Sequence, residues 1–146
     1  MSDDNSTNNP EDILGFMKDH IKRYLASDGT DGHDMNGNPC LVITTVGKKS
    51  GEPRQAAVIY GKEGDKVVVI ASKGGSDIAP SWYTNMAALG GAIIQIGADR
   101  MAVSMRVADG EERQRLWKMM AGIFPAYDEY QKKTSRVIPV VVLEKV

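Results

Sequence analysis

The sequence of 146 residues has few of the side chains that bind metals or form covalent cross-links: one cysteine, Cys40, and two histidines, His20 and His33. A single cysteine excludes an internal disulfide framework. We therefore expect folding to depend on a hydrophobic core in a reducing compartment, the cytoplasm. One cysteine and two histidines are too few for a Cys/His zinc site, so no metal site is predicted.

Long apolar runs, a strong net charge and several catalytic motifs are also missing. No apolar stretch approaches the ~20 residues that span a bilayer, and the acidic start of the chain lacks the pattern of a secretory signal. The net charge of −1 argues against a basic nucleic-acid-binding protein. Walker, G-x-G-x-x-G and G-x-S-x-G motifs are absent, and Cys40 has no neighbouring histidine in the sequence. A cofactor with its own reactivity fits better than catalysis by side chains.

The remaining sequence is a succession of short strand patterns. Residues 1–9 are expected to be disordered, 10–26 to form an amphipathic helix with Asn9 as N-cap, and 27–39 to form a linker loop. Strands are expected at 40–46, 55–61, 66–72, 92–96, 100–107 and 138–143, and further helices at Pro80 and after Asp109. Pro125 must end or restart the second of these helices. Short connections favour an antiparallel sheet, so residues 40–146 predict one α+β domain built on a small barrel or curled sheet.

The near-zero net charge conceals an uneven distribution. Residues 1–39 have 3 basic and 8 acidic side chains, whereas residues 40–73 have 6 basic and 3 acidic ones. The positive segment includes Thr44–Arg54, whose glycines let the backbone approach a ligand closely. Its cations are Lys48, Lys49 and Arg54, and an arginine can hold a phosphate or carboxylate through two parallel hydrogen bonds. The alternative interpretation is a solvated hairpin turn with charged tips.

Three further segments are candidates for a binding site. In Ala71–Ser76, Lys73 stands beside two glycines, which suits either an anionic ligand or an ordinary glycine turn. In residues 80–85, Trp82 can stack on a flat ring or be buried in the core. Tyr127 and Tyr130 share one helical face. Their hydroxyls either donate to a developing oxyanion or belong to a half-buried aromatic pair.

The order of these motifs resembles the deazaflavin-dependent nitroreductase family. The matching runs cover about residues 39–146 and are LVITTVGKKSGEPR, VVVIASKGG, P-S-W-Y-x-N and FPAYDEYQKKTSRVIPVVVL. The resemblance implies a split β-barrel like that of FMN-binding proteins, with about six mostly antiparallel strands and flanking helices. It also implies an F420H2-dependent oxidoreductase, associated with mycobacteria, that transfers a hydride from reduced coenzyme F420 to electron-poor small molecules. Those molecules are quinones, coumarin-type and furanocoumarin lactones, and nitroaromatics.

The resemblance also implies roles for individual residues. The coenzyme's phosphate and glutamate tail would be held by Lys48, Lys49, Ser50 and Arg54. The strand beneath it would be lined by Gln55, Ala56, Ala57, Val58 and Ile59. Its ring and linker would be contacted by Ile70, Ala71, Ser72 and Lys73. Its other side would be flanked by Ser81, Trp82, Tyr83, Thr84 and Asn85, with Tyr127 closing the site.

Two tyrosines are the candidate catalytic residues. Tyr127 and Tyr130 match family tyrosines that contact the substrate, and either is a candidate proton donor. Phe124 stands where nitroimidazole-activating members tend to have another tyrosine, which argues against that activity here. Two other functions fit the residues: an FMN-binding split-barrel reductase, and a carrier that binds F420 without turnover.

The expected partner is a small-molecule substrate, and no nucleic acid is expected. Split barrels often pair, so a homodimer stays open. The helix over residues 10–25 has an apolar stripe with Lys18, Lys22 and Arg23 beside it. It can pack on the barrel, which the acidic side chains near it favour, or touch a membrane surface weakly.

Overall fold

The computed structural model describes residues 10–35, 37–47 and 49–146, and the side chains of the first helix from Met17 onward. Its centre is a closed antiparallel barrel of six strands. In barrel order these are β2 (Asn38–Val46), β3 (Pro53–Glu63), β4 (Lys66–Ile70), β7 (Val140–Lys145), β6 (Asp99–Val107) and β5 (Gly91–Ile96). The barrel closes where β5 returns to β2, with Ile43 opposite Ile94. The predicted α+β split-barrel class is confirmed.

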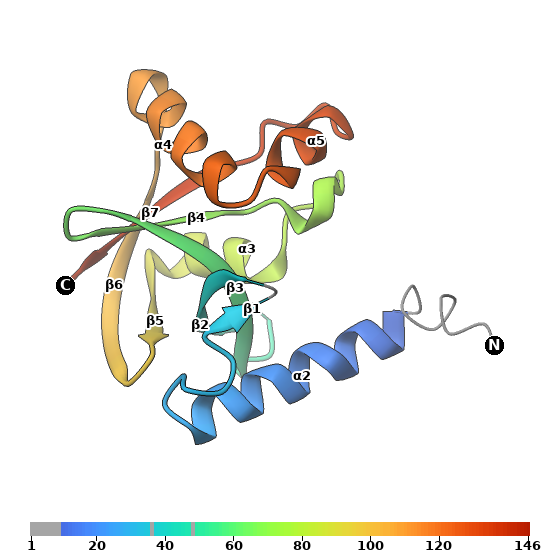
Figure 1. The fold of residues 1–146 in the computed structure, drawn as a ribbon, viewed down its shortest axis with the longest axis vertical. Helices are drawn as coiled ribbons and strands as arrows, with labels where there is room; N and C mark the ends of the chain where they lie inside the picture. The colour runs from blue at the N-terminus through green and yellow to red at the C-terminus, as the bar shows by residue number, and fades with distance from the viewer. Residues whose placement is uncertain (1–9, 36, 48) are drawn as a thin grey trace.

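The helices cover the barrel on different sides. Helices α4 (Gly110–Ile123) and α5 (Ala126–Lys132) lie along one side, and α2 (Pro10–Ala26) lies on the opposite side, with its first turns extending beyond the strands (Figure 1). Helix α3 (Ser81–Leu89) contributes Trp82 and Met86 to the barrel interior. As predicted, Asp109 is at the N-cap of α4. Helix α4 ends before Pro125, which is at the N-cap of a new helix, α5.

Strand alternation sorts the apolar residues into an inner and an outer core. Along β6, Met101, Val103 and Met105 face the barrel interior, as their alternation predicts, and Val107 is exposed at the end of the strand. A second core between the barrel and helices α4 and α5 includes Leu116 and Met120. The result is two apolar layers that share β4 and β7.

Residues 27–39, predicted as a linker loop, are bound to the barrel more closely than a linker would be. They contain β1 (Asp34–Met35), which pairs with the start of β2. A Cβ at Gly29 would lie 2.5 Å from the Cα of Gly97, so only glycine fits this contact. The predicted disorder of 1–9 and the N-cap at Asn9 lie outside the described residues.

Helix α2 is anchored to the barrel by its C-terminal half. Ile21 and Tyr24 are buried in a third core with Cys40, Val42 and Ala57. The Tyr24 hydroxyl accepts a hydrogen bond from the Gly97 N–H at 2.8 Å. The described part of the apolar stripe therefore packs on the barrel. None of the helices in the described part of the chain has the length and apolar character needed to cross a membrane.

Candidate functional site

The ring of strands is closed, but the pairing between β3 and β4 is interrupted along the first half of β3, which leaves an opening in the barrel wall. Strand β4 pairs only with Tyr60–Glu63, so Pro53–Ile59 pair with β2 on one side and with no described strand on the other. The chain leaves β4 after Ile70, forms the short helix η1 (Lys73–Gly75) and returns in α3, which contacts both β2 and β3. The three predicted segments 54–59, 70–73 and 81–85 therefore border one opening.

The predicted residues of β3 do not share one face. Period-2 alternation directs Ala56 and Val58 to the barrel interior, where both pack on the inner core. Ala57 is buried beneath α2, and Ile59 packs against the core below α4. Of the five predicted residues, Gln55 is the exposed one, so a ligand above this strand meets mainly its backbone edge.

The hairpin before β3 brings two of the predicted tail-binding residues together. The Gly47 N–H donates to the Glu52 carbonyl at 2.8 Å, which closes the turn. Arg54 Nη2 donates to Ser50 Oγ at 3.5 Å, and a Cβ at Gly47 would lie 2.6 Å from that oxygen. Lys49 is exposed on the same turn. Lys48, which the resemblance groups with them, lies outside the described residues.

A groove of about 710 Å³ lies at the Pro53 end of the opening. Its described lining residues come from α2, β3 and the start of α3: Met17, Lys18, Ile21, Lys22, Leu25, Pro53, Arg54, Gln55 and Ser81. Three of these side chains are cationic and none of them is acidic. The groove therefore suits an anionic ligand, and it adds α2 to the predicted site.

Three of the predicted residues at the end of β4 are buried. Ile70 belongs to the core beneath α4 and α5, whereas Ala71 belongs to the barrel interior. Ser72 is 8% exposed. A ligand at this end of the opening therefore meets Lys73, whose side chain is exposed, before it meets the other three.

The loop that follows β4 has an unusual backbone. Lys73 has a φ of 46°, in the left-handed region that β-carbon sterics disfavour, and Gly74 and Gly75 follow with φ of 65° and 84°. A Cβ at Gly75 would lie 2.7 Å from the Tyr130 carbonyl oxygen, so the loop packs tightly on α5. Strain of this kind is concentrated at functional sites. In this conformation the Lys73 side chain is exposed at the other end of the opening.

Arg136 holds this loop, although the sequence did not point to it. Its Nε donates to the Ser76 carbonyl at 2.7 Å, its Nη2 to the Ser72 carbonyl at 2.9 Å, and both Nη atoms to the Ala71 carbonyl at 3.3 Å. These partners are 60 to 65 residues away in the sequence. Arg136 lies within the run that resembles the family, but the resemblance gives it no role, so only the fold shows what it does.

The two candidate catalytic tyrosines lie on α5, beside η1. Tyr127 is buried among Trp117, Phe124 and Tyr130, with ring centroids 5.0 to 6.4 Å away. Burial, and next the Tyr130 phenol, raise the pKa of Tyr127 well above its ordinary value. Tyr130 is only half-buried, and Lys133 Nζ lies 5.5 Å from its ring centroid. Tyr130 is therefore the more accessible hydroxyl-bearing side chain.

Helix α3 presents a polar rather than an aromatic surface to the opening. Trp82 is 8% exposed and belongs to the barrel core, as one of the two interpretations of its motif predicted. Asn85 is buried, and its Nδ2 donates to Thr45 Oγ1 at 3.4 Å. Ser81 and Thr84 are exposed and Tyr83 is half-buried. The exposed residues of this predicted set are therefore hydroxyl-bearing.

Cys40 has a histidine neighbour that the sequence did not reveal. The fold brings His20 Nε2 to 3.5 Å from Cys40 Sγ, and both groups donate to the Gly32 carbonyl at 2.8 Å. Burial and then the charge of Asp34 raise the pKa of Cys40 to about 11. The thiol is therefore protonated near neutral pH and is not a nucleophile. This pair anchors α2.

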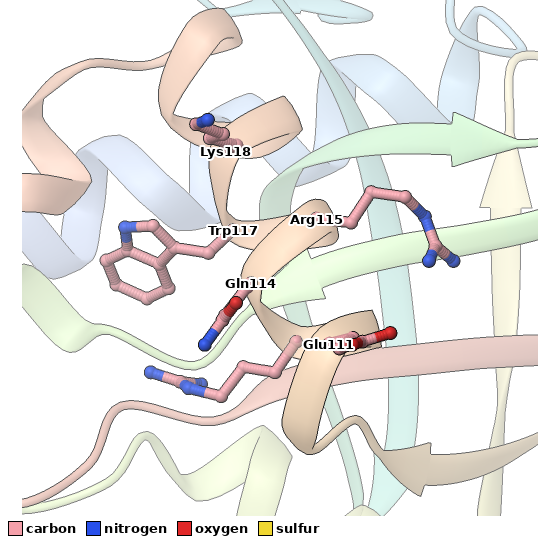
Figure 2. Close-up of a pocket in the computed structure, with 6 residues that line it drawn as sticks. Glu111, Gln114, Arg115, Trp117 and Lys118 are labelled. Carbon is pink, nitrogen blue, oxygen red and sulfur yellow. The ribbon is translucent and has the colours of Figure 1, made fainter.

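A second hollow, of about 640 Å³, lies along the outer surface of α4. Figure 2 shows that its side chains project from this one helix, among them Glu111, Gln114 and Lys118. Trp117 Nε1 donates to Asp128 at 2.7 Å, and Arg113 lies 5.2 Å from the Trp117 ring centroid. None of the described residues that line this hollow is a predicted coenzyme residue, so the groove beneath α2 is the better candidate.

Comparison with known proteins identifies the family. The family described as F420H(2)-dependent quinone reductase matches residues 16–145. A protein of Mycobacterium tuberculosis with the same description is 35% identical over 134 residues, which cover 89% of this chain and 90% of that protein. The family match spans the groove and all the described candidate residues.

Two solved structures agree with this match. One, described as a domain-swapped dimer, has a TM-score of 0.70 and 35% identity, and covers 93% of this chain and 100% of that one. Another, an F420-H2 dependent reductase, has a TM-score of 0.66 and 39% identity, and covers 73% of this chain and 94% of that one. The chain therefore belongs to the F420H(2)-dependent quinone reductase family, whose oxidoreductases use reduced coenzyme F420 as their cofactor.

Proposed function

We propose that this enzyme reduces quinones with F420H2, and that coumarin-type and furanocoumarin lactones and nitroaromatics are further acceptors. The observation that carries the proposal is the opening beside β3, which has a cationic groove at one end and, near the other, a loop that packs on the backbone of α5 at Tyr130. The relatives described as quinone reductases support quinones as the first substrate class.

The residues around the opening fit the coenzyme. The anionic phosphate and carboxylates of F420 need cations and hydroxyl donors, which Lys49, Ser50 and Arg54 supply. The flat ring needs a narrow slot, and the loop held by Arg136 would form one of its walls. The bound coenzyme supplies the hydride, so the protein's task is to bind, orient and exclude water.

Two exposed aliphatic side chains support an apolar acceptor. Ile78 and Val137 are 69% and 70% exposed. They lie on two loops, the one after β4 and the one before β7, which are joined by hydrogen bonds. Ile78 directly follows Asp77, which accepts from Thr134, and Val137 directly follows Arg136, which donates to Ser76. Exposed apolar residues beside a polar site are typical of a contact surface for an apolar ligand. A quinone ring has this character.

We assign the contact with the substrate's developing charge to Tyr130. Its side chain is the less buried of the pair, whereas Tyr127 is held inside the aromatic cluster. A phenol can donate a hydrogen bond or a proton to an oxygen that gains charge as a quinone is reduced. Tyr127 would then position α5 against the loop.

A titration tests coenzyme choice. Replacing Trp117 by Phe leaves Trp82, which is buried on the helix that borders the opening, as the sole tryptophan reporter. We expect F420 to change its fluorescence at micromolar concentrations and FMN to leave it unchanged. Micromolar binding of FMN without binding of F420 would make the protein a flavoprotein and overturn the proposal.

A turnover assay tests the reaction. We expect oxidation of F420H2 to require an added acceptor, with a naphthoquinone faster than a coumarin or a nitroaromatic. Binding of F420 without oxidation by any of the three acceptors would identify a carrier instead of an enzyme.

We also infer that the protein forms a homodimer. A solved structure that is 35% identical is described as a domain-swapped dimer and aligns with 93% of this chain. Light scattering after gel filtration should give twice the chain mass of 15.9 kDa. A single-chain mass at all protein concentrations would contradict the inference.

A further inference from the structure

We infer that the groove between α2 and β3 binds the oligoglutamate tail of the coenzyme, and that Lys18 and Lys22 of α2 recognise its carboxylates. This inference rests on the proposed F420 site and extends it to a helix that the sequence suggested only for packing or for membrane contact. Both lysines line the groove, opposite Arg54 of β3.

From Met17 onward, the charged side chains of α2 are divided between its two flanks. On one flank, Arg23 is 3.0 Å from Asp19 and 3.0 Å from Asp31, so its charge is compensated. On the groove flank, Lys18 and Lys22 form no ion pair with any side chain in the described part of the chain. The groove therefore has cations whose counter-charge is not supplied by the described residues.

The spacing of the lysines leaves a mild repulsion within the helix when no anion is bound. Lys18 and Lys22 are four residues apart, and like charges at this spacing destabilise a helix. Arg54 on the facing wall adds a third positive charge to the same groove. An anion between the two walls would remove the repulsion, and a single phosphate would compensate only part of it. A chain of carboxylates matches three cations spread along a groove.

The helix is held firmly enough to present these lysines. Close to Lys22 in the sequence, Tyr24 is completely buried and its hydroxyl accepts from the Gly97 N–H at 2.8 Å. His20, between the two lysines, donates to the Gly32 carbonyl at 2.8 Å. The two exposed lysine side chains therefore project from a fixed backbone, which lowers the entropy cost of binding.

The test compares coenzymes that differ only in their tail. Dissociation constants of F420 with a long tail, with a short tail and with no glutamate would be measured by fluorescence for wild type and for Lys18→Ala/Lys22→Ala. Two exposed ion pairs together are worth roughly tenfold in affinity. We expect the double variant to bind the long-tail form about tenfold more weakly and the form without glutamate unchanged.

Three controls make the result specific. Lys66→Ala/Lys145→Ala removes the same charge from the start of β4 and the end of β7, and should leave all affinities unchanged. Raising the salt concentration should reduce the difference between wild type and the groove variant. Both lysines are exposed, so the melting temperature of the groove variant should stay close to that of wild type.

The outcomes separate this inference from the proposed function. If wild type binds F420 and the groove variant keeps the wild-type dependence on tail length, the tail site is wrong and the F420 site stands. If the groove variant loses affinity equally for the form without glutamate, α2 supports the ring site and the tail assignment is also wrong. If wild type binds no form of F420, the proposed function itself fails.

Discussion

The guanidinium of Arg136 and the carbonyl oxygen of Ala71 are joined by two hydrogen bonds of 3.3 Å, across 65 residues of sequence. The same guanidinium also binds the carbonyls of Ser72 and Ser76. One side chain thus fixes the loop that leaves β4 and borders the opening. In the proposed site it would act on the coenzyme only through this loop, as a positioning residue.

Replacing Arg136 by Ala should weaken coenzyme binding without removing a coenzyme contact. The loss of hydrogen bonds from a charged group costs about 1.5–3 kcal/mol, which we expect to appear partly in stability and partly in the F420 dissociation constant. Arg136→Lys keeps the charge but loses the several planar N–H donors of the guanidinium group, and should recover only part of the loss. Arg100→Ala, on the exposed side of β6, is the matched control. Equal KM values for F420H2 in wild type and Arg136→Ala would contradict the positioning role.

Lys73→Gly should make the protein more stable and its coenzyme binding weaker. Glycine accepts the φ of 46° that lysine adopts under strain, so we expect a gain of about 1 kcal/mol and a rise in melting temperature of roughly 2–4 °C. The loss of the exposed cation should raise the F420 dissociation constant. Gly74→Ala, at a φ of 65° with open space around it, should do the opposite to stability. A lower melting temperature for Lys73→Gly would show that the lysine has stabilising contacts instead.

Most of the fold could be predicted from the sequence because local patterns control it. The alternation of Met101, Val103 and Met105 predicted the inner face of β6, and Asp109 predicted the start of α4. The pattern was less informative for 27–39. The sequence suggests that Gly29 belongs to a flexible loop, whereas glycine is required there because the backbone lies against Gly97. A contact between residues so distant in the sequence has no local signature.

The sequence proposes candidate site residues from their chemical type, but it does not show which way their side chains point. Arg54 and Ser50, which the resemblance groups together, lie 3.5 Å apart in the fold. The resemblance treats the run from Gln55 to Ile59 as one surface, although a strand directs alternate residues to opposite faces. Neither Arg136 nor Lys22 could be assigned to the site from the sequence, because their relation to it is created only when distant elements pack together.

Tyr130→Phe should slow quinone reduction more than Tyr127→Phe does. Tyr130 is half-buried beside the loop, and removing a proton donor typically costs about 100-fold or more in turnover. Tyr127→Phe keeps the aromatic packing and should change turnover little. The measurement is kcat with saturating quinone, with the F420 dissociation constant as a check on binding. If both variants keep the wild-type kcat, solvent is the proton source.

The protein should stay in the soluble fraction when it is floated with anionic liposomes. Ile21 and Tyr24, which belong to the apolar stripe of α2, are buried against the barrel and are not available to insert into lipid. Tyr24→Ala should loosen the helix and is the informative comparison, because it exposes the stripe. Flotation of the wild-type protein would show that residues before Met17 bind the membrane or that α2 leaves the barrel.

Stability should fall in alkaline solution, in part because of Cys40. Its ordinary thiol pKa of 9.0 is raised to about 11 in the folded chain by burial. Below pH 9 the thiol is protonated in both states and the full stability is present. Between about pH 9 and pH 11 the unfolded chain ionises first, so the free energy of unfolding falls by roughly 2–3 kcal/mol.

Cys40→Ala isolates this contribution. Burial also raises the pKa of Tyr24 and Tyr60, so the variant should still lose stability at high pH, but less of it and at higher pH than wild type. The quantity to compare is the change in unfolding free energy from about pH 8 to about pH 11, since the variant leaves a small cavity at every pH. Parallel curves for the two proteins would mean that the Cys40 thiol titrates normally in the folded state. Such a thiol would be accessible to solvent, contrary to its complete burial beside His20 and Gly32.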